Sequence, residues 1–249
     1  QTNKVAAFFS LTKELELGKR LPTKNLYMIP KIRGLIADIS LGKNDPMPII
    51  DLRNSKQVLN LLNDKNLSKL ENRGMASPDH VIRTKGAPLH IKNIADYQDE
   101  KVLKKHIEGF SSRYIKYFSR QSKRADEKKS ILTADPKHGW LRSIGVIGVG
   151  KNAKEASATA DLAEQNLHIR IISEKFGGFY PIKEKDMFDC EYWSLEQAKL
   201  GKGKPPAFEG KVVIVTGGAG TIGLETAKAF SRLGANILLV DNNQKLLDI

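Results

Sequence analysis

The chain has 249 residues, of which 40% are hydrophobic and 28% are charged, so it could form one large globular domain or two small ones. Its single cysteine, Cys190, excludes a disulfide framework and fits a reducing compartment. No apolar run approaches the roughly 20 residues that span a bilayer. No signal peptide is recognisable either, so we expect a cytoplasmic protein without a membrane partner.

The net charge of +13 at pH 7 would suit a nucleic-acid partner, but charge alone does not specify one. The lysines and arginines are dispersed along the chain. No basic stretch alternates with the aromatic residues on which single-stranded bases stack. We therefore interpret the charge as a lysine-rich enzyme surface and expect no nucleic-acid partner, although a basic nucleic-acid-binding protein stays open as an alternative.

Apolar spacing predicts the elements of the first half of the chain. Helices are predicted over residues 4–17, 30–38, 55–74 and 99–118. Short strands are predicted over residues 48–52, 81–82 and 89–91. Turns or exposed loops are predicted over residues 44–46, 77–80 and 120–129. Ser55 can cap the helix predicted over residues 55–74, and Gly74 can end it.

Residues 143–150 predict a strand that enters a glycine turn, and the alanine-rich residues 151–173 predict a helix behind it. Strand, glycine turn and helix in this order resemble half of a βαβ unit. Residues 201–206 are rich in glycine, lysine and proline and lie between two patterned regions, which indicates a linker.

The segment behind this linker carries the pattern most indicative of chemistry. Residues 211–216 are a β-branched apolar run typical of a strand buried on both faces, and a glycine-rich turn follows at once. A helix pattern up to Leu233 and a second buried strand over residues 236–240 come next, with Asp241 at its end. This is the order of the opening βαβ unit of a dinucleotide-binding Rossmann fold.

Each glycine of the turn has a physical task in that fold. Gly217 lets the chain leave the strand sharply, Gly220 leaves room for a diphosphate, and Gly223 lets the helix pack closely. The N–H groups at the start of the helix would face the phosphates. Asp241 can accept hydrogen bonds from ribose hydroxyls and would repel a 2′-phosphate, so NAD is expected rather than NADP. The predicted NAD-binding residues are Thr216, Gly217, Gly220, Thr221, Ile222, Gly223 and Asp241.

The turn resembles the nucleotide-binding loop of the short-chain dehydrogenase/reductase family over residues 216–223. Thr221 stands where the commonest pattern has glycine, so the subclass stays open. The resemblance implies a catalytic serine and a Tyr-x-x-x-Lys pair far downstream, in which the lysine lowers the pKa of the tyrosine. Residues 97–101 match this spacing but precede the nucleotide fold, which indicates chance. We therefore assign no catalytic residue to this chain.

A second candidate site lies earlier in the chain. His80, Arg83 and Lys85 stand close together, and such a group could bind a phosphate or a carboxylate. The alternative is a solvated turn that Asp79 holds. The five histidines include no His-x-His or His-x-x-x-His arrangement, so we expect no metal site built from this chain alone.

Three segments, residues 77–85, 145–156 and 191–201, together resemble the bifunctional family that joins a class II aldolase to a short-chain dehydrogenase. This family is similar to rhamnulose-1-phosphate aldolase/alcohol dehydrogenase fusions. The resemblance implies an α/β fold. It implies that residues 1–200 are the C-terminal part of the aldolase-like region and that residues 201–210 are a linker. Residues 211–249 would be the truncated N-terminal part of a Rossmann domain.

The aldolase half of that family binds a divalent metal, usually zinc, through histidine segments that would lie upstream of Gln1, so no residue here is assigned as a ligand. The resemblance also implies carbohydrate metabolism. A lyase would cleave a sugar phosphate, and an NAD-dependent oxidoreductase would act on an aldehyde or alcohol. We therefore expect a fragment of such an enzyme, inactive by itself. A non-catalytic dinucleotide-binding or scaffold protein is the alternative, and a homo-oligomer stays open.

Overall fold

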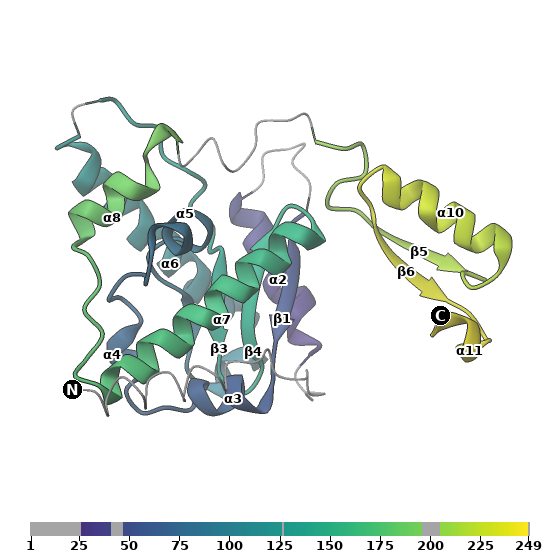
Figure 1. The fold of residues 1–249 in the computed structure, drawn as a ribbon, viewed down its shortest axis with the longest axis horizontal. Coiled ribbons are helices and arrows are strands. Elements are labelled where there is room, and N and C mark those ends of the chain that lie inside the picture. Colours follow the sequence, from purple (N-terminus) through teal and green to yellow (C-terminus); the bar gives the residue numbers. More distant parts are fainter. Residues whose placement is uncertain (1–25, 41–46, 126, 196–204, 249) are drawn as a thin grey trace, which may run out of the picture.

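The protein has two separate sheets with helices packed against them (Figure 1). This computed structural model describes residues 26–40, 47–125, 127–195 and 205–248. The larger sheet has four strands in the order β1–β4–β3–β2, and the smaller sheet pairs β5 with β6. The α/β class predicted from the sequence is therefore confirmed.

The larger sheet is mixed, because β2 and β3 pair in parallel while β4 runs antiparallel to both of its neighbours. Its strands are β1 (Ile49–Arg53), β2 (Leu89–Ile91), β3 (His138–Leu141) and β4 (Gly145–Gly150). The elements around it are α2 (Met28–Ser40), α3 (Lys56–Leu62), α4 (Leu67–Leu70), α5 (Pro78–Thr84), the 3-10 helix η1 (Ile94–Gln98), α6 (Glu100–Ser122), α7 (Ala153–Lys175) and α8 (Glu184–Glu191).

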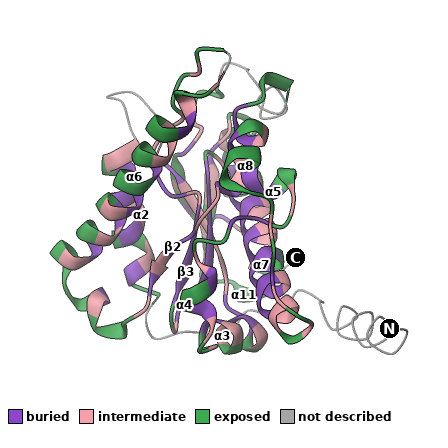
Figure 2. Cartoon of the chain, turned by 90° about the vertical axis from the view of Figure 1, so that its left-hand side faces the viewer, coloured by how far each residue is buried: buried purple, intermediate pink, exposed green. Residues whose placement is uncertain are grey.

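Helices cover both faces of the larger sheet, which gives three layers (Figure 2). Successive side chains of a strand point to opposite faces, and β4 follows this rule. Ile147 and Val149 pack in the core that α2 and α6 complete, whereas Val146 packs with Trp140 against α7. All residues of β4 are buried, so this strand lies at the centre of the fold.

The glycines of β4 lie inside the strand, so the predicted glycine turn is wrong. A Cβ atom on Gly148 would lie 2.2 Å from the backbone nitrogen of Ala160, and one on Gly150 would lie 2.3 Å from that of Ala156. These glycines therefore let the alanine face of α7 lie directly against the strand. The comparison with half of a βαβ unit is wrong as well, because such a unit joins parallel strands and β4 has antiparallel neighbours.

Residues 77–84 also differ from the prediction, which placed a loop and a short strand there. They form α5, whose N-cap is Ser77, with Pro78 in the first turn. The Ser77 side chain accepts a hydrogen bond from the backbone N–H of His80, as N-cap residues do. Val81 and Ile82 are buried residues of this helix. A short apolar run fits a helix or a strand equally well, and here the cap decides.

Other predicted elements are confirmed, with changes at their ends, except that the helix predicted over residues 55–74 is two helices: α3 ends at Leu62 and α4 begins at Leu67. The structure contains the predicted α2, β1, α3, β2, α6, α7, β5, α10 and β6. Ser55 caps α3 by accepting a hydrogen bond from the N–H of Val58. α6 continues to Ser122, so the predicted loop over residues 120–129 begins too early. The predicted helix at 4–17, the turn at 44–46 and residues 201–204 of the linker lie outside the described residues.

The smaller sheet forms a strand–helix–strand unit. It consists of β5 (Val212–Thr216), α10 (Thr221–Arg232), β6 (Asn236–Val240) and the short α11 (Gln244–Leu247), and its strands are parallel. β5 was predicted to be buried on both faces and β6 to be a second buried strand, yet only Val215 of β5 is buried and no residue of β6 is. Within the described residues β5 pairs with β6 alone, whereas burial on both faces needs helices on both sides of the sheet.

None of the described helices is both long and apolar enough to cross a membrane.

Candidate functional site

The glycine-rich turn lies between β5 and α10, where the sequence predicts it (Figure 1). Gly217 has a φ of +65°, a conformation that residues with a Cβ rarely adopt. A Cβ on Gly223 would lie 2.1 Å from the carbonyl oxygen of Gly217, so only glycine lets the first turn of α10 come this close. Both glycines are therefore required by the chain's own geometry.

Gly220 is different, because nothing in the described structure requires a glycine there. Its φ of −75° suits any residue. A Cβ at this position would meet only the carbonyl oxygen of Gly217, at 3.4 Å, which is ordinary contact. The space beside Gly220 is thus open. A ligand that approaches this backbone would use the room that the missing side chain leaves.

The start of α10 offers backbone donors at the same place. Gly220 is its N-cap and supplies no side-chain cap. The first N–H groups of an α-helix have no partner within the helix, and here they belong to Thr221, Ile222 and Gly223. The positive end of the helix dipole adds to their attraction for anions. The arrangement suits a phosphate or diphosphate group.

Asp241 connects the end of β6 to this turn. Its Oδ1 accepts a hydrogen bond from the N–H of Asn243 at 3.0 Å, and its Oδ2 accepts one from the N–H of Ala219 at 3.0 Å. These backbone donors, Asn243 before Ala219, hold the pKa of the Asp241 carboxyl below its usual range, so the group is charged at neutral pH. A carboxylate has about four acceptor positions, so both oxygens can accept further donors such as ribose hydroxyls.

The predicted NAD-binding residues therefore lie together at one end of the smaller sheet. The turn and the start of α10 supply five of them, and Asp241 is hydrogen-bonded to the turn. Thr216 ends β5 opposite Val240 of β6. Their binding of NAD remains a prediction, because the geometry alone identifies no particular ligand.

The three residues of the second candidate do not converge on one point. His80 is buried, with its Nδ1 2.7 Å from the Ser77 Oγ, and burial lowers its pKa. Arg83 is half-buried in the last turn of α5. The Lys85 side chain is buried elsewhere, and its Nζ donates to the carbonyl oxygens of Thr133 and Asp135. These contacts do not bring the three side chains together in one anion-binding site, and that role stays a prediction.

Lys85 instead lines a cavity of about 310 Å³ that the sequence does not reveal. The cavity lies where α5, α6 and α8 meet, and the other cations in its lining are Arg113, Lys116 and Arg120 of α6. Amphipathic spacing assigns these α6 residues to a solvated face. No signal in the sequence places them beside Lys85, because α8 closes the cavity from a distant part of the chain.

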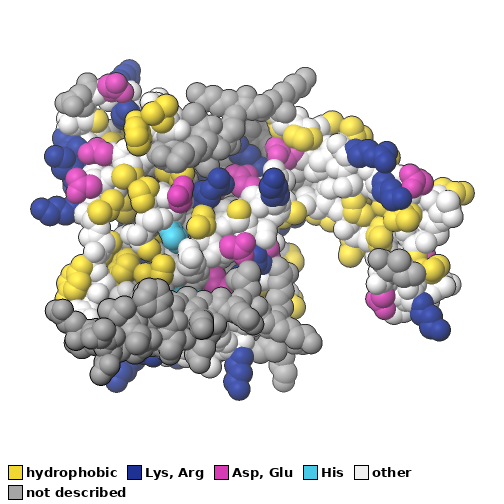
Figure 3. Space-filling view, in the orientation of Figure 1, with side chains coloured by type: hydrophobic (Ala, Val, Ile, Leu, Met, Phe, Trp, Pro, Cys, Tyr) yellow, Lys and Arg dark blue, Asp and Glu magenta, His cyan; other side chains and the backbone are white. Residues whose placement is uncertain are grey.

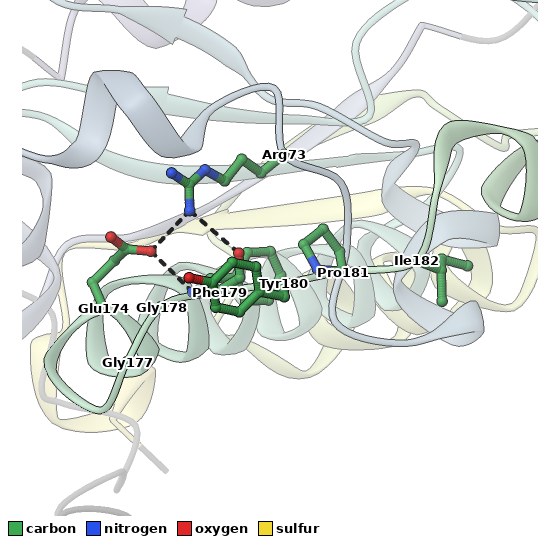
Figure 4. Close-up of a pocket in the computed structure, with 8 residues that line it drawn as sticks. All are labelled: Arg73, Glu174, Gly177, Gly178, Phe179, Tyr180, Pro181 and Ile182. Carbon is green, nitrogen blue, oxygen red and sulfur yellow. Dashed lines mark hydrogen bonds and ion pairs between the residues drawn. The ribbon is translucent and has the colours of Figure 1, made fainter.

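A second hollow, of about 590 Å³, lies along residues 177–182 (Figure 4). Its charged groups bind one another. The Arg73 guanidinium donates to Glu174 Oε1 at 3.0 Å and to the carbonyl oxygen of Phe179 at 3.3 Å. Glu174 also accepts a hydrogen bond from the N–H of Phe179 at 2.9 Å. These contacts hold the segment in place and leave few groups for a ligand.

No group of three or more His, Cys, Asp and Glu side chains among the described residues is arranged to hold an ion. His90 and His106 each pair with one carboxylate, Glu71 and Asp96 respectively. Single pairs of this kind are structural contacts and fall short of the four ligands typical of zinc.

Comparison with known proteins assigns most of the chain to a protein family. A family model described as the second domain of class II aldolases matches residues 23–200. A Bacillus subtilis protein named uncharacterized oxidoreductase YuxG is 28% identical over 221 residues, which cover 87% of this chain and 31% of that protein. Short-chain dehydrogenase reductase 4 of Arabidopsis thaliana is 36% identical over 76 residues, which cover 28% of this chain and 25% of that protein. The chain thus spans less than a third of these relatives.

Proposed function

Because the chain belongs to the family of class II aldolase second domains, we propose that it is part of an enzyme that joins an aldolase region to an NAD-dependent short-chain dehydrogenase. The similarities to an oxidoreductase and to a short-chain dehydrogenase support the enzymatic and oxidoreductase character. The fusion of two activities, the preference for NAD and a substrate of the rhamnulose 1-phosphate type are the finer parts of this proposal.

The observation that carries the proposal is the open space at Gly220. Gly217 and Gly223 have structural reasons within the chain, but Gly220 has none. A glycine without a steric reason, next to an uncapped helix start, fits a site where a diphosphate approaches the backbone. The charged Asp241 would accept the adenosine ribose hydroxyls and disfavour a 2′-phosphate, which supports NAD over NADP.

In this proposal the chain supplies binding and orientation. The turn would hold the diphosphate, and Asp241 would fix the ribose, so that the cofactor extends in one direction from the end of β5. When bound, NAD supplies the hydride acceptor for oxidation of an aldehyde or alcohol. The described residues offer no set of metal ligands, so no step of the aldolase reaction is assigned to them.

The test is NAD binding by the full 249-residue chain, measured by isothermal titration calorimetry for the wild type and for Gly220→Ala. The variant should fold normally, because the added Cβ meets only an ordinary contact. It should weaken NAD binding at least about tenfold, or about 1.4 kcal/mol, because the methyl group occupies the path of the diphosphate. Gly34→Ala is the matched control, since a Cβ on Gly34 meets nothing within 4 Å.

Absence of NAD binding by the wild type, or equal binding by Gly220→Ala, would refute the dinucleotide site. A second measurement concerns the catalytic half of the proposal. NADH formation from an aldehyde by the longer protein would support it. NAD binding without any turnover would favour a non-catalytic dinucleotide-binding or scaffold protein.

A further inference from the structure

We propose that the cavity between α5, α6 and α8 is a binding site for a small phosphorylated metabolite. The cavity has a volume of about 310 Å³, near the lower end of the range of about 300–1,000 Å³ that small-molecule sites occupy. This size favours a metabolite of a few carbon atoms over a dinucleotide. The inference does not depend on the proposed NAD site, because the cavity and the glycine turn share no residue.

The charge of the lining selects an anion. Its charged residues are four cations, Lys85, Arg113, Lys116 and Arg120, and one anion, Glu184. Glu184 balances Arg120, and Asp135 lies 3.9 Å from the Nζ of Lys85, which leaves two uncompensated cations. A phosphate monoester carries about −1.5 to −2 charges at neutral pH, whereas a carboxylate carries one. The guanidinium fork of an arginine also matches the oxygens of a phosphate. A phosphate therefore fits this lining better than a monocarboxylate does.

Two of these cations have no acidic partner in the part of the chain that the structure describes. Arg120 donates to both oxygens of Glu184 at 2.8 Å, so its charge is balanced. Among the described residues, no ion pair or side-chain hydrogen bond engages Arg113 or Lys116. They are three residues apart on α6, where like charges repel and destabilise a helix. An anion bound between them and the cavity wall would remove that repulsion.

Lys85 contributes the buried end of the site. Its Nζ donates to the carbonyl oxygen of Asp135 at 2.5 Å and lies 4.1 Å from the centre of the Tyr114 ring. Its backbone has φ +62° and ψ 179°, a region used almost only by glycine, at a cost of about 1–3 kcal/mol. A lysine kept in such a conformation indicates that its side chain is needed where it lies.

The remaining walls suit the carbon part of a metabolite. Phe110, Tyr114 and Tyr117 of α6 and Met187 of α8 supply aromatic and thioether surface. The hydroxyl groups of both tyrosines donate to the buried carboxylate of Glu191, at 2.7 and 3.0 Å, which fixes their rings in place. A rigid aromatic wall beside a basic rim favours an organic phosphate over a free phosphate ion.

The experiment compares two double variants of α6 in the full chain. Arg113→Gln with Lys116→Gln removes the two unpaired cations from the cavity. Lys104→Gln with Lys105→Gln removes the same charge from the same helix, at positions that are exposed, as Arg113 and Lys116 are, but lie outside the lining of the cavity. Titration calorimetry with glycerol 3-phosphate should give a dissociation constant below about 1 mM for the wild type.

The cavity variant should weaken this binding at least about tenfold, and the control variant less than about twofold, because the control lysines lie outside the lining of the cavity and Lys104 already pairs with Glu108. NAD affinity should stay unchanged in both variants, which separates this site from the dinucleotide site. Absence of glycerol 3-phosphate binding by the wild type would overturn the proposal. So would an equal loss in both variants, which would indicate attraction to the overall charge alone.

Two further probes test the ligand class. D-glycerate has a similar size but carries a carboxylate, and it should bind more weakly than glycerol 3-phosphate. Inorganic phosphate lacks the carbon part and should also bind more weakly. Equal affinity for D-glycerate would contradict the selection for phosphate, and equal affinity for inorganic phosphate would contradict the role of the aromatic wall.

Discussion

β4 and β5 are both short apolar strands associated with glycines and followed by a helix, yet their surroundings differ. β4 lies between β1 and β3, with α2 and α6 on one face and α7 on the other, and all of its residues are buried. β5 has β6 as its neighbour in the described residues, and Val212 and Ile214 in it are 52% and 62% exposed. Figure 3 shows hydrophobic side chains on the surface of this smaller unit.

The glycines of the two strands differ in the same way. Gly148 and Gly150 of β4 lie against the backbone of α7, so their lack of a side chain serves packing. Gly220, beyond the end of β5, lies beside open space. A local pattern of strand, glycines and helix therefore does not identify a ligand site by itself. A glycine indicates a ligand only where the protein itself does not fill the space that it leaves.

The largest effect should follow from Gly148→Val. Its Cβ would lie 2.2 Å from the backbone nitrogen of Ala160, and no side-chain movement can relieve a clash with backbone. We expect a loss of more than about 3 kcal/mol in the unfolding free energy of the larger region. Urea unfolding followed by tryptophan fluorescence measures it, with Trp193→Phe as the common background so that only the buried Trp140 emits.

Gly34→Ala provides the control for Gly148→Val. Gly34 lies in α2, and a Cβ there meets nothing within 4 Å. This variant should be stabilised by about 0.5–1 kcal/mol, because alanine favours a helix interior. A Gly148→Val protein as stable as the wild type would show that α7 does not pack against β4 in solution.

A pair of isoleucines sharpens the comparison of the two strands. Ile147 of β4 is fully buried, so Ile147→Ala should cost about 2–5 kcal/mol. Ile214 of β5 is 62% exposed, so Ile214→Ala should change stability by less than about 0.5 kcal/mol. Chemical unfolding of each full-length variant measures both values. Equal losses would mean that β5 is covered in solution by a partner or a second copy.

Acid should destabilise the larger region, because three of its histidines are buried. Burial lowers the pKa of His138 to about 3 and that of His168 to about 4, and it lowers the pKa of His80. In the unfolded chain the histidine pKa is near 6.5. Between pH 6.5 and the lowered pKa of each buried histidine, the unfolded chain therefore binds more protons than the folded chain. Stability should therefore be greatest above about pH 6.5 and should fall as the pH drops toward 3.

The expected slope is at most about 1.4 kcal/mol per pH unit for each histidine. Urea midpoints at pH 7 and pH 5, read from Trp140 fluorescence, measure it. His138→Gln should reduce the slope, whatever its own effect on stability at pH 7. The smaller unit has no histidine, since His168 is the last in the chain. An unchanged midpoint at pH 5 would show that these histidines are accessible to protons in the folded state.

The spacing of apolar residues predicted the helices that bury one face against the sheet. The helices α2, α6 and α7 lie close to their predicted ranges, because their apolar residues repeat at helical spacing. β3 was not predicted, since its four residues include His138 and Gly139 and are buried only through their neighbours in the sheet. α8 was not predicted either, because more than half of its eight residues are charged and its few apolar residues show no helical repeat.

The two candidate sites differ in how far the sequence could reveal them. The residues of the glycine turn are adjacent in the chain, so their spacing alone indicates the geometry. The residues of the cavity come from α5, α6 and α8, and only tertiary packing brings Lys85 near Arg113 and Met187. A pattern within one segment can therefore predict a helix-end site, but not a cavity between segments.

The smallest effect should follow from Asp241→Asn, which tests how the smaller unit holds its turn without a large core. Asp241 accepts hydrogen bonds from the N–H groups of Ala219 and Asn243, and an asparagine amide has only one oxygen to accept them. Hydrogen exchange at the Ala219 amide should become faster, while Trp140 fluorescence reports unchanged unfolding of the larger region.

Asp248→Asn is the control for Asp241→Asn, because it removes the same charge from an exposed acid that bonds only locally, to Gln244. Equal exchange at Ala219 in both variants would mean that Asp241 does not hold the turn. Faster exchange in Asp241→Asn alone would connect the end of β6 to the position of the turn amides, which face the diphosphate in the proposed function. In that case the acid proposed to select NAD would also hold the turn proposed to bind it, so Asp241→Asn should weaken both the turn and the proposed NAD binding.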